Sequence, residues 1–196
     1  PVNSRTATLK RIAGSIVGAL KGALPDKIPA DSAGELLVLS LGGKNLSGKP
    51  YVVGEFNAGG SGGGPRKDGV DVIETDGSNC MNMPVEALEL EAPARVHRMS
   101  LRRDSGGVGE YRGGLGCVRE IEFLTDNIAL THRGERHRHA ARGSRNGGDG
   151  AKAFSKIVRQ DGSEEVVHSK LFTVVHSGER LIGETAGGGG YGIPHE

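Results

Sequence analysis

Glycine is the sequence feature that most constrains how this chain folds. It makes up 34 of the 196 residues, more than twice the average share of about 7%. The glycines gather between apolar, β-rich runs, which is unlike a collagen repeat or a flexible linker. We therefore predict a folded protein whose backbone takes special conformations in several loops. The clusters lie at residues 59–64, 106–116, 143–150 and 187–192.

The remaining composition predicts a single domain with a thin core. The length suits one domain, but only 35% of the residues are hydrophobic and tryptophan is absent, so we expect a chain that depends on a partner. A formal net charge of +1 argues against non-specific nucleic-acid binding. The two cysteines, Cys80 and Cys117, and the lack of an apolar spanning segment predict a reduced, cytoplasmic protein without a membrane anchor.

The sequence pattern of residues 1–30 predicts a helix followed by a linker. Apolar side chains recur at i, i+3, i+4 and i+7 from Leu9 to Leu24, Ser4 is a candidate N-cap, and two prolines follow the pattern. Glycines recur on another face of this helix, at Gly14, Gly18 and Gly22. Each weakens a helix, so either a close neighbour packs on them or the helix is marginal.

The sequence pattern of residues 31–196 predicts a β-rich body. Alternation such as Val96–Leu101 predicts strands with one buried and one solvated face. The C-terminal third resembles a meander with turns at Asp161-Gly162 and Ser177-Gly178. The fold class is therefore α+β: an N-terminal helix, then a predominantly β body with long ordered glycine-rich loops. The expected strands are Glu35–Leu41, Tyr51–Phe56, Val70–Glu74, Arg95–Leu101, Cys117–Phe123, Ile128–His132, Phe154–Arg159, Glu165–His168, Leu171–Val175 and Arg180–Glu184.

Two glycine-rich loops carry charges that suit an anion. Consecutive glycines in GGSGGGPRKD (residues 59–68) can present several backbone N–H groups, although the loop lacks the Gly-Lys-Ser/Thr ending of a Walker A motif. The stretch LRRDSGGVGEYRGGLG places Asp104 and Arg112 on one loop. The planar guanidinium group of an arginine can donate paired hydrogen bonds to a carboxylate or a phosphate. The alternatives are a mobile loop in the first case and a structural Asp–Arg pair in the second.

Histidines and arginines gather in HRGERHRHAAR, residues 132–142. We interpret this segment as a cationic surface that faces an anionic ligand or a partner subunit. His137 and His139 would share one face of a strand and could bind a metal ion, but no third ligand is evident nearby. We therefore assign no metal site to this chain.

Acidic residues gather in NCMNMPVEALELE, residues 79–91. Glu86 lies among apolar residues and proline, which makes it a candidate for proton transfer if it is partly buried; the alternative is a solvated face. The glycine-rich tail AGGGGYGIP contains Tyr191 and ends at Pro194. We expect this tail to be ordered and docked on the body instead of disordered.

Several motifs, in order, resemble one known family. The runs GGSGGGPRKDGVD, NMPVEALELEAP, LRRDSGGVGEYRGGLGCVRE and AGGGGYGIP resemble the C-terminal part of the hydantoinase B / 5-oxoprolinase family. That family includes N-methylhydantoinase and caprolactamase B-type subunits and the related acetone and acetophenone carboxylase subunits. The resemblance covers nearly the whole chain, from about Pro25 to Pro194. The Asp/His metal motifs of the family's N-terminal part are absent from this sequence.

The resemblance implies a subunit of an ATP-dependent enzyme that hydrolyses hydantoins, oxoproline or lactams. Its partners would be a hydantoinase A-type subunit, which binds ATP and Mg²⁺, and an N-terminal B-type chain. This chain would be the C-terminal portion of the B-type subunit, either encoded separately or produced by cleavage. A divalent zinc or manganese ion would lie in another chain. The alternatives are an ATP-dependent ketone carboxylase subunit and a non-catalytic assembly subunit.

As hypotheses, Asp104 and Glu86 are the candidate catalytic residues, with Asp104 orienting Arg112 or a water molecule. An arginine cluster would hold a phosphorylated intermediate, because phosphoryl transfer depends mainly on positioning and charge stabilisation. The candidate substrate- or phosphate-binding residues are Arg112, Arg133, Arg136, Asp68 and Asn82.

Overall fold

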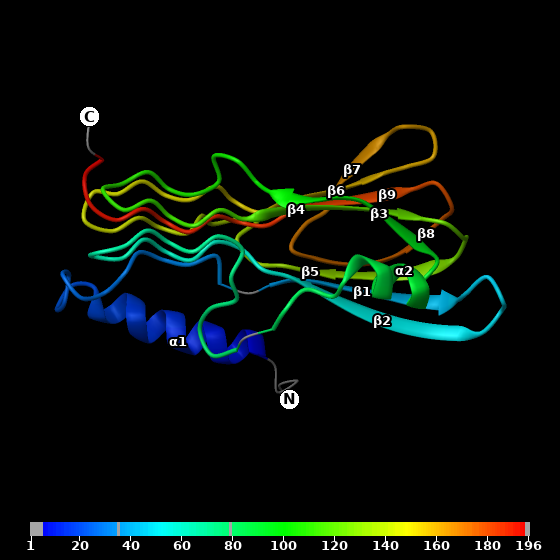
Figure 1. The fold of residues 1–196 in the computed structure, drawn as a ribbon, viewed down its shortest axis with the longest axis horizontal. Coiled ribbons are helices and arrows are strands. Elements are labelled where there is room, and N and C mark those ends of the chain that lie inside the picture. The colour runs from blue at the N-terminus through cyan, green and yellow to red at the C-terminus, as the bar shows by residue number, and fades with distance from the viewer. Residues whose placement is uncertain (1–5, 35, 79, 195–196) are drawn as a thin grey trace.

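The computed structural model describes residues 6–34, 36–78 and 80–194. Within these residues, a β-sandwich and a bundle of glycine-rich segments lie end to end, with the longer helix along the bundle (Figure 1). The helices are α1 (Thr6–Leu20) and α2 (Val85–Glu91). The strands are β1 (Leu37–Lys44), β2 (Pro50–Asn57), β3 (Ala94–Leu101), β4 (Cys117–Phe123), β5 (Ile128–Arg133), β6 (Phe154–Val158), β7 (Glu164–Val166), β8 (Lys170–Val175) and β9 (Arg180–Glu184). The α+β class with a β-rich body is confirmed.

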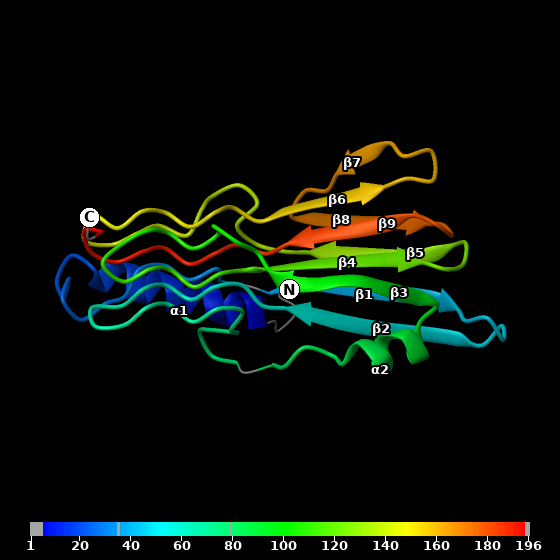
Figure 2. The ribbon, with the colours of Figure 1, turned by 45° about the horizontal axis from the view of Figure 1, so that its top comes forward.

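The sandwich consists of two antiparallel sheets. One has the order β2-β1-β5-β8 and the other β3-β4-β9-β6-β7. Alternate residues of β5, Ile128 and Leu130, are fully buried and point into the core between the sheets, as strand geometry requires. Helix α2 flanks β2 at the edge of the sandwich (Figure 2) and buries Leu88 completely. No helix in the described part of the chain is long and apolar enough to cross a membrane.

Two polar contacts join the sheets across this core. Glu55 of β2 forms an ion pair with Arg119 of β4, and the two side chains are 3% and 1% exposed. Burial raises the pKa of Glu55, and the Arg119 charge opposes this shift. Nε2 of His132 (β5) lies 2.9 Å from Oγ of Ser155 (β6), and both residues are buried. Buried polar pairs of this kind favour one alignment of the sheets, because any other leaves their polar groups unsatisfied.

The glycine-rich segments form a bundle of extended chains, with the tail at its centre. The wavy runs at the left of Figure 1 lie side by side without the pleated pairing of the sandwich. Gly188 N–H donates to Gly114 O at 2.9 Å, Gly189 N–H to Asp31 O at 2.9 Å and Gly190 N–H to Gly148 O at 2.9 Å. Residues 186–192 are buried, and their backbone bonds reach every other segment of the bundle. The segments are residues 30–33, 58–72, 104–116, 140–151 and 185–192.

Glycine is required in this bundle because the backbones approach too closely for a side chain. A Cβ atom added at Gly60 would lie 1.8 Å from Gly114 O, and one at Gly188 would lie 1.9 Å from Ser61 O. Collagen needs glycine for the same reason, where its chains crowd around a common axis. The glycine-rich stretches are therefore packed structural segments and not surface loops.

Helix α1 is fixed to the body through its charged side chains. Lys10 Nζ donates to Glu74 Oε1 at 2.8 Å, and both side chains are fully buried. Burial alone would raise the pKa of Glu74, but hydrogen bonds from Lys10, Ser78 and Cys80 outweigh it and lower that pKa to about 2. Further along, Lys21 forms an ion pair with Asp31.

Several local predictions differ from the structure. The helical pattern continues to Leu24, but α1 ends at Leu20 and the chain turns before the prolines; Ser4 lies outside the described residues. The expected strand Val70–Glu74 is wrong, since its backbone bonds with the glycine bundle and Val72 has a φ of 44°. The helix α2 is absent from the predicted elements, because its seven residues are too short to show clear helical periodicity.

The predicted meander and the alternation of β3 are also only partly right. β6 and β7 form a hairpin, but β8 pairs with β5 in the other sheet, and β9 returns to pair with β4 and β6. Local spacing cannot distinguish a strand that pairs with its neighbour from one that changes sheet. In β3 a bulge between Val96 and Arg98 shifts the faces, so that Met99 and Leu101 pair with the buried residues Arg119 and Cys117. Both side chains on this edge strand are nevertheless 45% and 47% exposed.

We predict that Gly188→Ala lowers the free energy of unfolding by about 3 kcal/mol or more, because a backbone carbonyl occupies the space of the new methyl group. Gly42→Ala in β1 is the matched control: its nearest contacts would lie at 3.7 Å, and we expect a change below about 1 kcal/mol. Chemical denaturation of both variants measures the difference. Equal stability of the two would contradict the packing argument.

We predict that stability falls as the pH drops from about 6.5 to about 4, because His132 must be neutral in the fold. Burial, with a contribution from nearby His137, lowers the pKa of His132 to about 4, against about 6.5 in an unfolded chain. The folded state therefore binds fewer protons, and the loss reaches about 3 kcal/mol at pH 4. Urea unfolding of wild type and of His132→Gln at pH 7 and pH 4 tests this. Between these pH values, the free energy of unfolding should fall less for the variant than for the wild type.

Candidate cationic cleft

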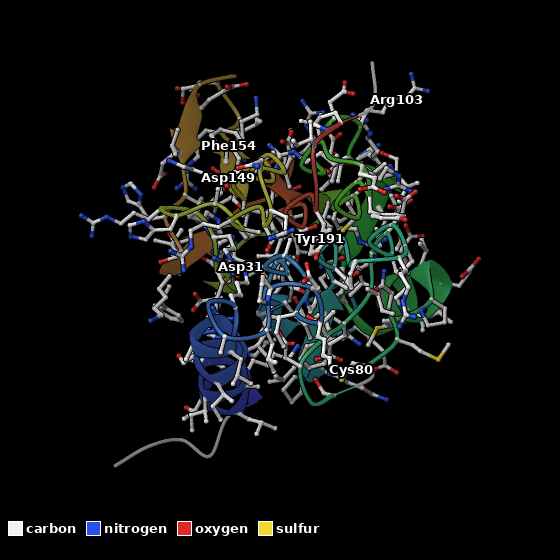
Figure 3. The ribbon with its side chains drawn as sticks, turned by 90° about the vertical axis from the view of Figure 1, so that its left-hand side faces the viewer. Asp31, Cys80, Arg103, Asp149, Phe154 and Tyr191 are labelled. Carbon is white, nitrogen blue, oxygen red and sulfur yellow. The ribbon has the colours of Figure 1, made fainter. Side chains whose placement is uncertain are left out.

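A cleft of about 540 Å³ lies between helix α1 and the glycine bundle. Two smaller hollows, of about 490 and 210 Å³, adjoin it and share Arg136 with it. In Figure 3, which looks along the bundle, Asp31 lies between α1 and the bundle segments, while Tyr191 lies near the middle of the view. The charged residues that line the cleft are Arg11, Asp31, Asp76, Arg136 and Arg142.

Asp31 is the centre of the charge cluster. Its carboxylate pairs with Lys21, with Arg142 Nε at 3.5 Å and with Arg136 Nη2 at 3.8 Å. Burial acts to raise the pKa of Asp31, but the hydrogen bond and charge of Lys21, together with Arg136, lower it overall. One carboxylate thus faces several cations, so the cluster keeps an excess of positive charge.

Arg136 is held rigidly by backbone carbonyl groups. Its Nη1 donates to Ala140 O at 3.0 Å and its Nη2 to Ser32 O at 2.8 Å. Burial lowers the pKa of the guanidinium, Asp31 opposes this shift, and nearby Arg11 adds to it. The Nε atoms of both Arg136 and Arg11 are buried and make no hydrogen bond within the described residues. The excess of positive charge among the lining residues makes the cleft suitable for an anion.

Arg11 comes from α1 and closes the other side of the cleft. Its guanidinium packs over Gly34, where an added Cβ would lie 2.2 Å from Arg11 Nη2 and where the backbone φ is +83°. A glycine is needed there both for that conformation and for the close contact. The position of Arg11 therefore depends on contacts that only the folded chain brings together.

Of the predicted anion-binding residues, Arg136 lines the cleft and Arg133 lies at the end of β5. Arg133 is half-buried. The sequence-based description of residues 132–142 as a cationic surface fits this position. The paired histidines do not share a strand face, since residues 134–140 are irregular. His137 instead packs edge-on against His132, with ring centroids 5.5 Å apart. The described residues contain no group of three or more metal-ligating side chains.

Arg112 and Asp68 come together in the bundle, but with a third residue that sequence reasoning missed. Arg112 Nη1 and Nη2 donate to the two carboxylate oxygens of Asp71 at 2.7 and 3.2 Å. Asp68 Oδ1 accepts from the Arg112 backbone N–H at 2.9 Å. The hydrogen bond with Arg112 lowers the pKa of Asp71. Asp71, and not Asp104, is thus the ionic partner that holds this loop.

The other predicted site residues lie apart from the cleft. Asp104 is exposed and has a φ of 58°, a conformation that aspartate tolerates better than most residues. Glu86 is exposed in the first turn of α2, and Asn82 is half-buried with its Nδ2 4.0 Å from Met99 Sδ. None of these three is among the cleft-lining residues of the described chain.

The charged cleft residues that sequence reasoning missed are Arg11, Asp31, Asp76 and Arg142, together with Lys21, which pairs with Asp31. Arg142 lies inside the cationic segment at residues 132–142, but nothing in the sequence distinguishes it from the other arginines of that segment. Arg11 and Lys21 look like ordinary polar positions of an amphipathic helix, and Asp31 like a linker residue. Only the contact between α1 and the bundle gives them a common role.

Comparison with known proteins agrees with the motifs. The family model described as hydantoinase B/oxoprolinase matches residues 1–194. The B-type subunit of a putative D-/L-hydantoinase from Pseudomonas sp. (strain NS671) is 32% identical over 201 residues, with 100% of this chain and 33% of the relative covered.

Two solved structures share the fold. The ATP-dependent caprolactamase of Pseudomonas jessenii has a TM-score of 0.75 and 26% identity, with 89% of this chain and 32% of that chain covered. An acetone carboxylase, solved without nucleotide, has a TM-score of 0.69 and covers 83% of this chain and 27% of its own, but at 18% identity it shows the fold alone. The chain spans about a third of the length of some curated relatives that it matches, among them the hydantoinase subunit, and 8–11% of the 5-oxoprolinases.

A family match over nearly the full chain, the similarity to a hydantoinase subunit and the shared fold lead to one conclusion. The chain belongs to the hydantoinase B/oxoprolinase family.

Proposed function

We propose that this chain is part of an ATP-dependent enzyme that hydrolyses cyclic amides of the hydantoin, oxoproline or lactam type. The observation that carries the proposal is the family match over residues 1–194. The names of its relatives, a hydantoinase subunit and an ATP-dependent caprolactamase, support it. Its partners would be an A-type subunit, which binds ATP and Mg²⁺, and the rest of a B-type polypeptide, with a divalent zinc or manganese ion in another chain. A cytoplasmic location stays a prediction.

The chemistry explains why ATP and a cationic cleft belong together. An amide C–N bond is hard to break, because resonance stabilises the amide and the nitrogen is a poor leaving group. Transfer of a phosphoryl group to the amide oxygen removes that resonance and produces a highly charged intermediate. Such chemistry depends mainly on positioning and on compensation of negative charge. The Arg136 cleft, which Arg11 and Arg142 also line, fits this requirement in charge.

Within this proposal, Arg136 and Arg133 keep their role in holding a phosphorylated intermediate, and Arg11 and Arg142 join them. A phosphate-binding role is less favoured for Arg112 and Asp68, because both Nη atoms of the Arg112 guanidinium already donate to the Asp71 carboxylate. Asn82 remains a candidate polar contact. Asp104 and Glu86 remain candidates for proton transfer. Both are exposed here, so another chain would have to cover them to exclude water from the reaction.

Two alternatives are distinguished by one experiment. The native complex is purified, its subunits are identified by mass, and ATP hydrolysis is measured with hydantoins, lactams and ketones plus bicarbonate. Turnover that depends on a cyclic amide supports the proposal, whereas turnover only with a ketone and bicarbonate identifies a carboxylase. Full turnover by a complex that lacks this chain would make it an assembly subunit.

We predict that Arg142→Ala and Arg11→Ala each reduce kcat/KM of the assembled complex about 10- to 100-fold. This range corresponds to the loss of one charge-assisted hydrogen bond, about 1.5–3 kcal/mol. Arg98→Ala on β3 is the matched control, since that exposed arginine bonds only with nearby Ser100 among the described contacts. Steady-state ATP-coupled turnover checks the prediction, and wild-type rates in both cleft variants would remove the cleft from the site.

We predict that Asp104→Asn and Glu86→Gln reduce turnover of the complex by at least about 100-fold if these carboxylates transfer protons. The variants should unfold at wild-type temperature, because both side chains are exposed and asparagine tolerates the positive φ of residue 104. Turnover and thermal unfolding are measured together. Near wild-type turnover with intact assembly would show that neither residue is catalytic.

A further inference from the structure

Helix α1 presents its apolar face to solvent. Leu9, Ile12 and Ile16 are 51%, 54% and 57% exposed, and Leu20 is 39% exposed. These residues recur at intervals of three and four and so form one stripe. A surface helix normally turns such a stripe toward the core. Here the stripe is 39–57% exposed, although Leu9 at its start lies against Gly77.

The charged face of α1 is the one that contacts the body, which explains the orientation. Lys10 is fully buried against Glu74 and Arg11 packs over Gly34, while Lys21, directly after the helix, pairs with Asp31. If the helix rolled to bury its apolar stripe, the Glu74 carboxylate would remain buried without its cation, which is strongly unfavourable. The outward position of the stripe is thus a consequence of fixed ionic contacts.

The outward surface also has the composition of an interface core. The stretch Ile12–Leu20 contains no charged residue, and charge is depleted at the centre of stable protein interfaces. Gly14, Gly18 and Gly22 have nothing within 4 Å of an added Cβ, but they lie on the side of α1 opposite the stripe, where Gly14 and Gly18 line the cleft. This answers the question raised by their spacing: no neighbour within the described chain packs on them.

We propose that the apolar face of α1 is the docking surface for the remaining portion of a hydantoinase B-type polypeptide. The length of the relatives argues for this occupant: the matched region is 32–33% of each, so two thirds of a B-type polypeptide is available to cover the stripe. The inference rests on the proposed function, in which that portion is a partner.

The docking surface and the cleft lie on different sides of α1. Arg11, Gly14 and Gly18 line the cationic cleft, and at about 100° per residue they lie opposite the stripe formed by Leu9, Ile12, Ile16 and Leu20. The docking surface is therefore a feature separate from the anion-binding side of the helix.

The test is a binding experiment that does not depend on turnover. The tagged chain is co-expressed with the polypeptide that spans the rest of a B-type subunit from the same source, and the complex is measured by size exclusion and native mass spectrometry. The variant combines Ile12→Glu and Ile16→Lys. A Glu placed four residues before a Lys supports the helix, and both positions are exposed, so the variant should unfold at wild-type temperature. Leu46→Glu, in the β1–β2 turn and 80% exposed, is the control.

We expect a one-to-one complex of wild type and of the Leu46→Glu control, with at least tenfold weaker binding by the double variant. Amide exchange over residues 12–20 should slow in the wild-type complex. Equal binding by the double variant, or a wild-type homodimer that this variant disrupts, would overturn the proposal. A complex that forms as expected but turns over no cyclic amide supports the docking surface and counts only against the proposed function.

Discussion

Close approach of backbone to backbone is the constraint on which the rest of this structure depends. In the glycine bundle, an added Cβ would lie within 2 Å of a carbonyl oxygen at Gly60, Gly113, Gly187 and Gly188. The segments can therefore satisfy their hydrogen bonds with one another instead of with water. The bundle supplies a large part of the fold without a hydrophobic core, which accounts for a folded chain that is only 35% hydrophobic.

The bundle also positions the candidate site. Asp31 and Arg142 belong to bundle segments, and a backbone hydrogen bond of 3.0 Å from Asp31 N–H to Arg142 O links their chains. Helix α1 then brings Arg11 and Lys21 to the same carboxylate region through its charged face. The reversed orientation of α1 thus has two consequences: it concentrates positive charge in the cleft, and it leaves an apolar stripe partly exposed.

Much of the β-sandwich could be predicted, because burial on one face of a strand imposes a period of two that survives in the sequence. Strands such as Cys117–Phe123 were placed correctly. The exceptions have physical causes. The segment Val70–Glu74 has strand-like composition but bonds with glycine-rich chains, and β8 changes sheet in a way that no local pattern records. A bulge reverses the faces of β3.

The sequence by itself determined the family, the α+β class and the importance of the glycine-rich motifs, since all three follow from local residue order. Only the tertiary structure decided that those motifs form one bundle, that Arg112 pairs with Asp71, and that Arg11, Asp31, Arg136 and Arg142 share a cleft. It also decided which face of α1 is exposed: helical periodicity identifies an apolar stripe, but a buried ion pair 64 residues apart in sequence, Lys10–Glu74, sets its direction.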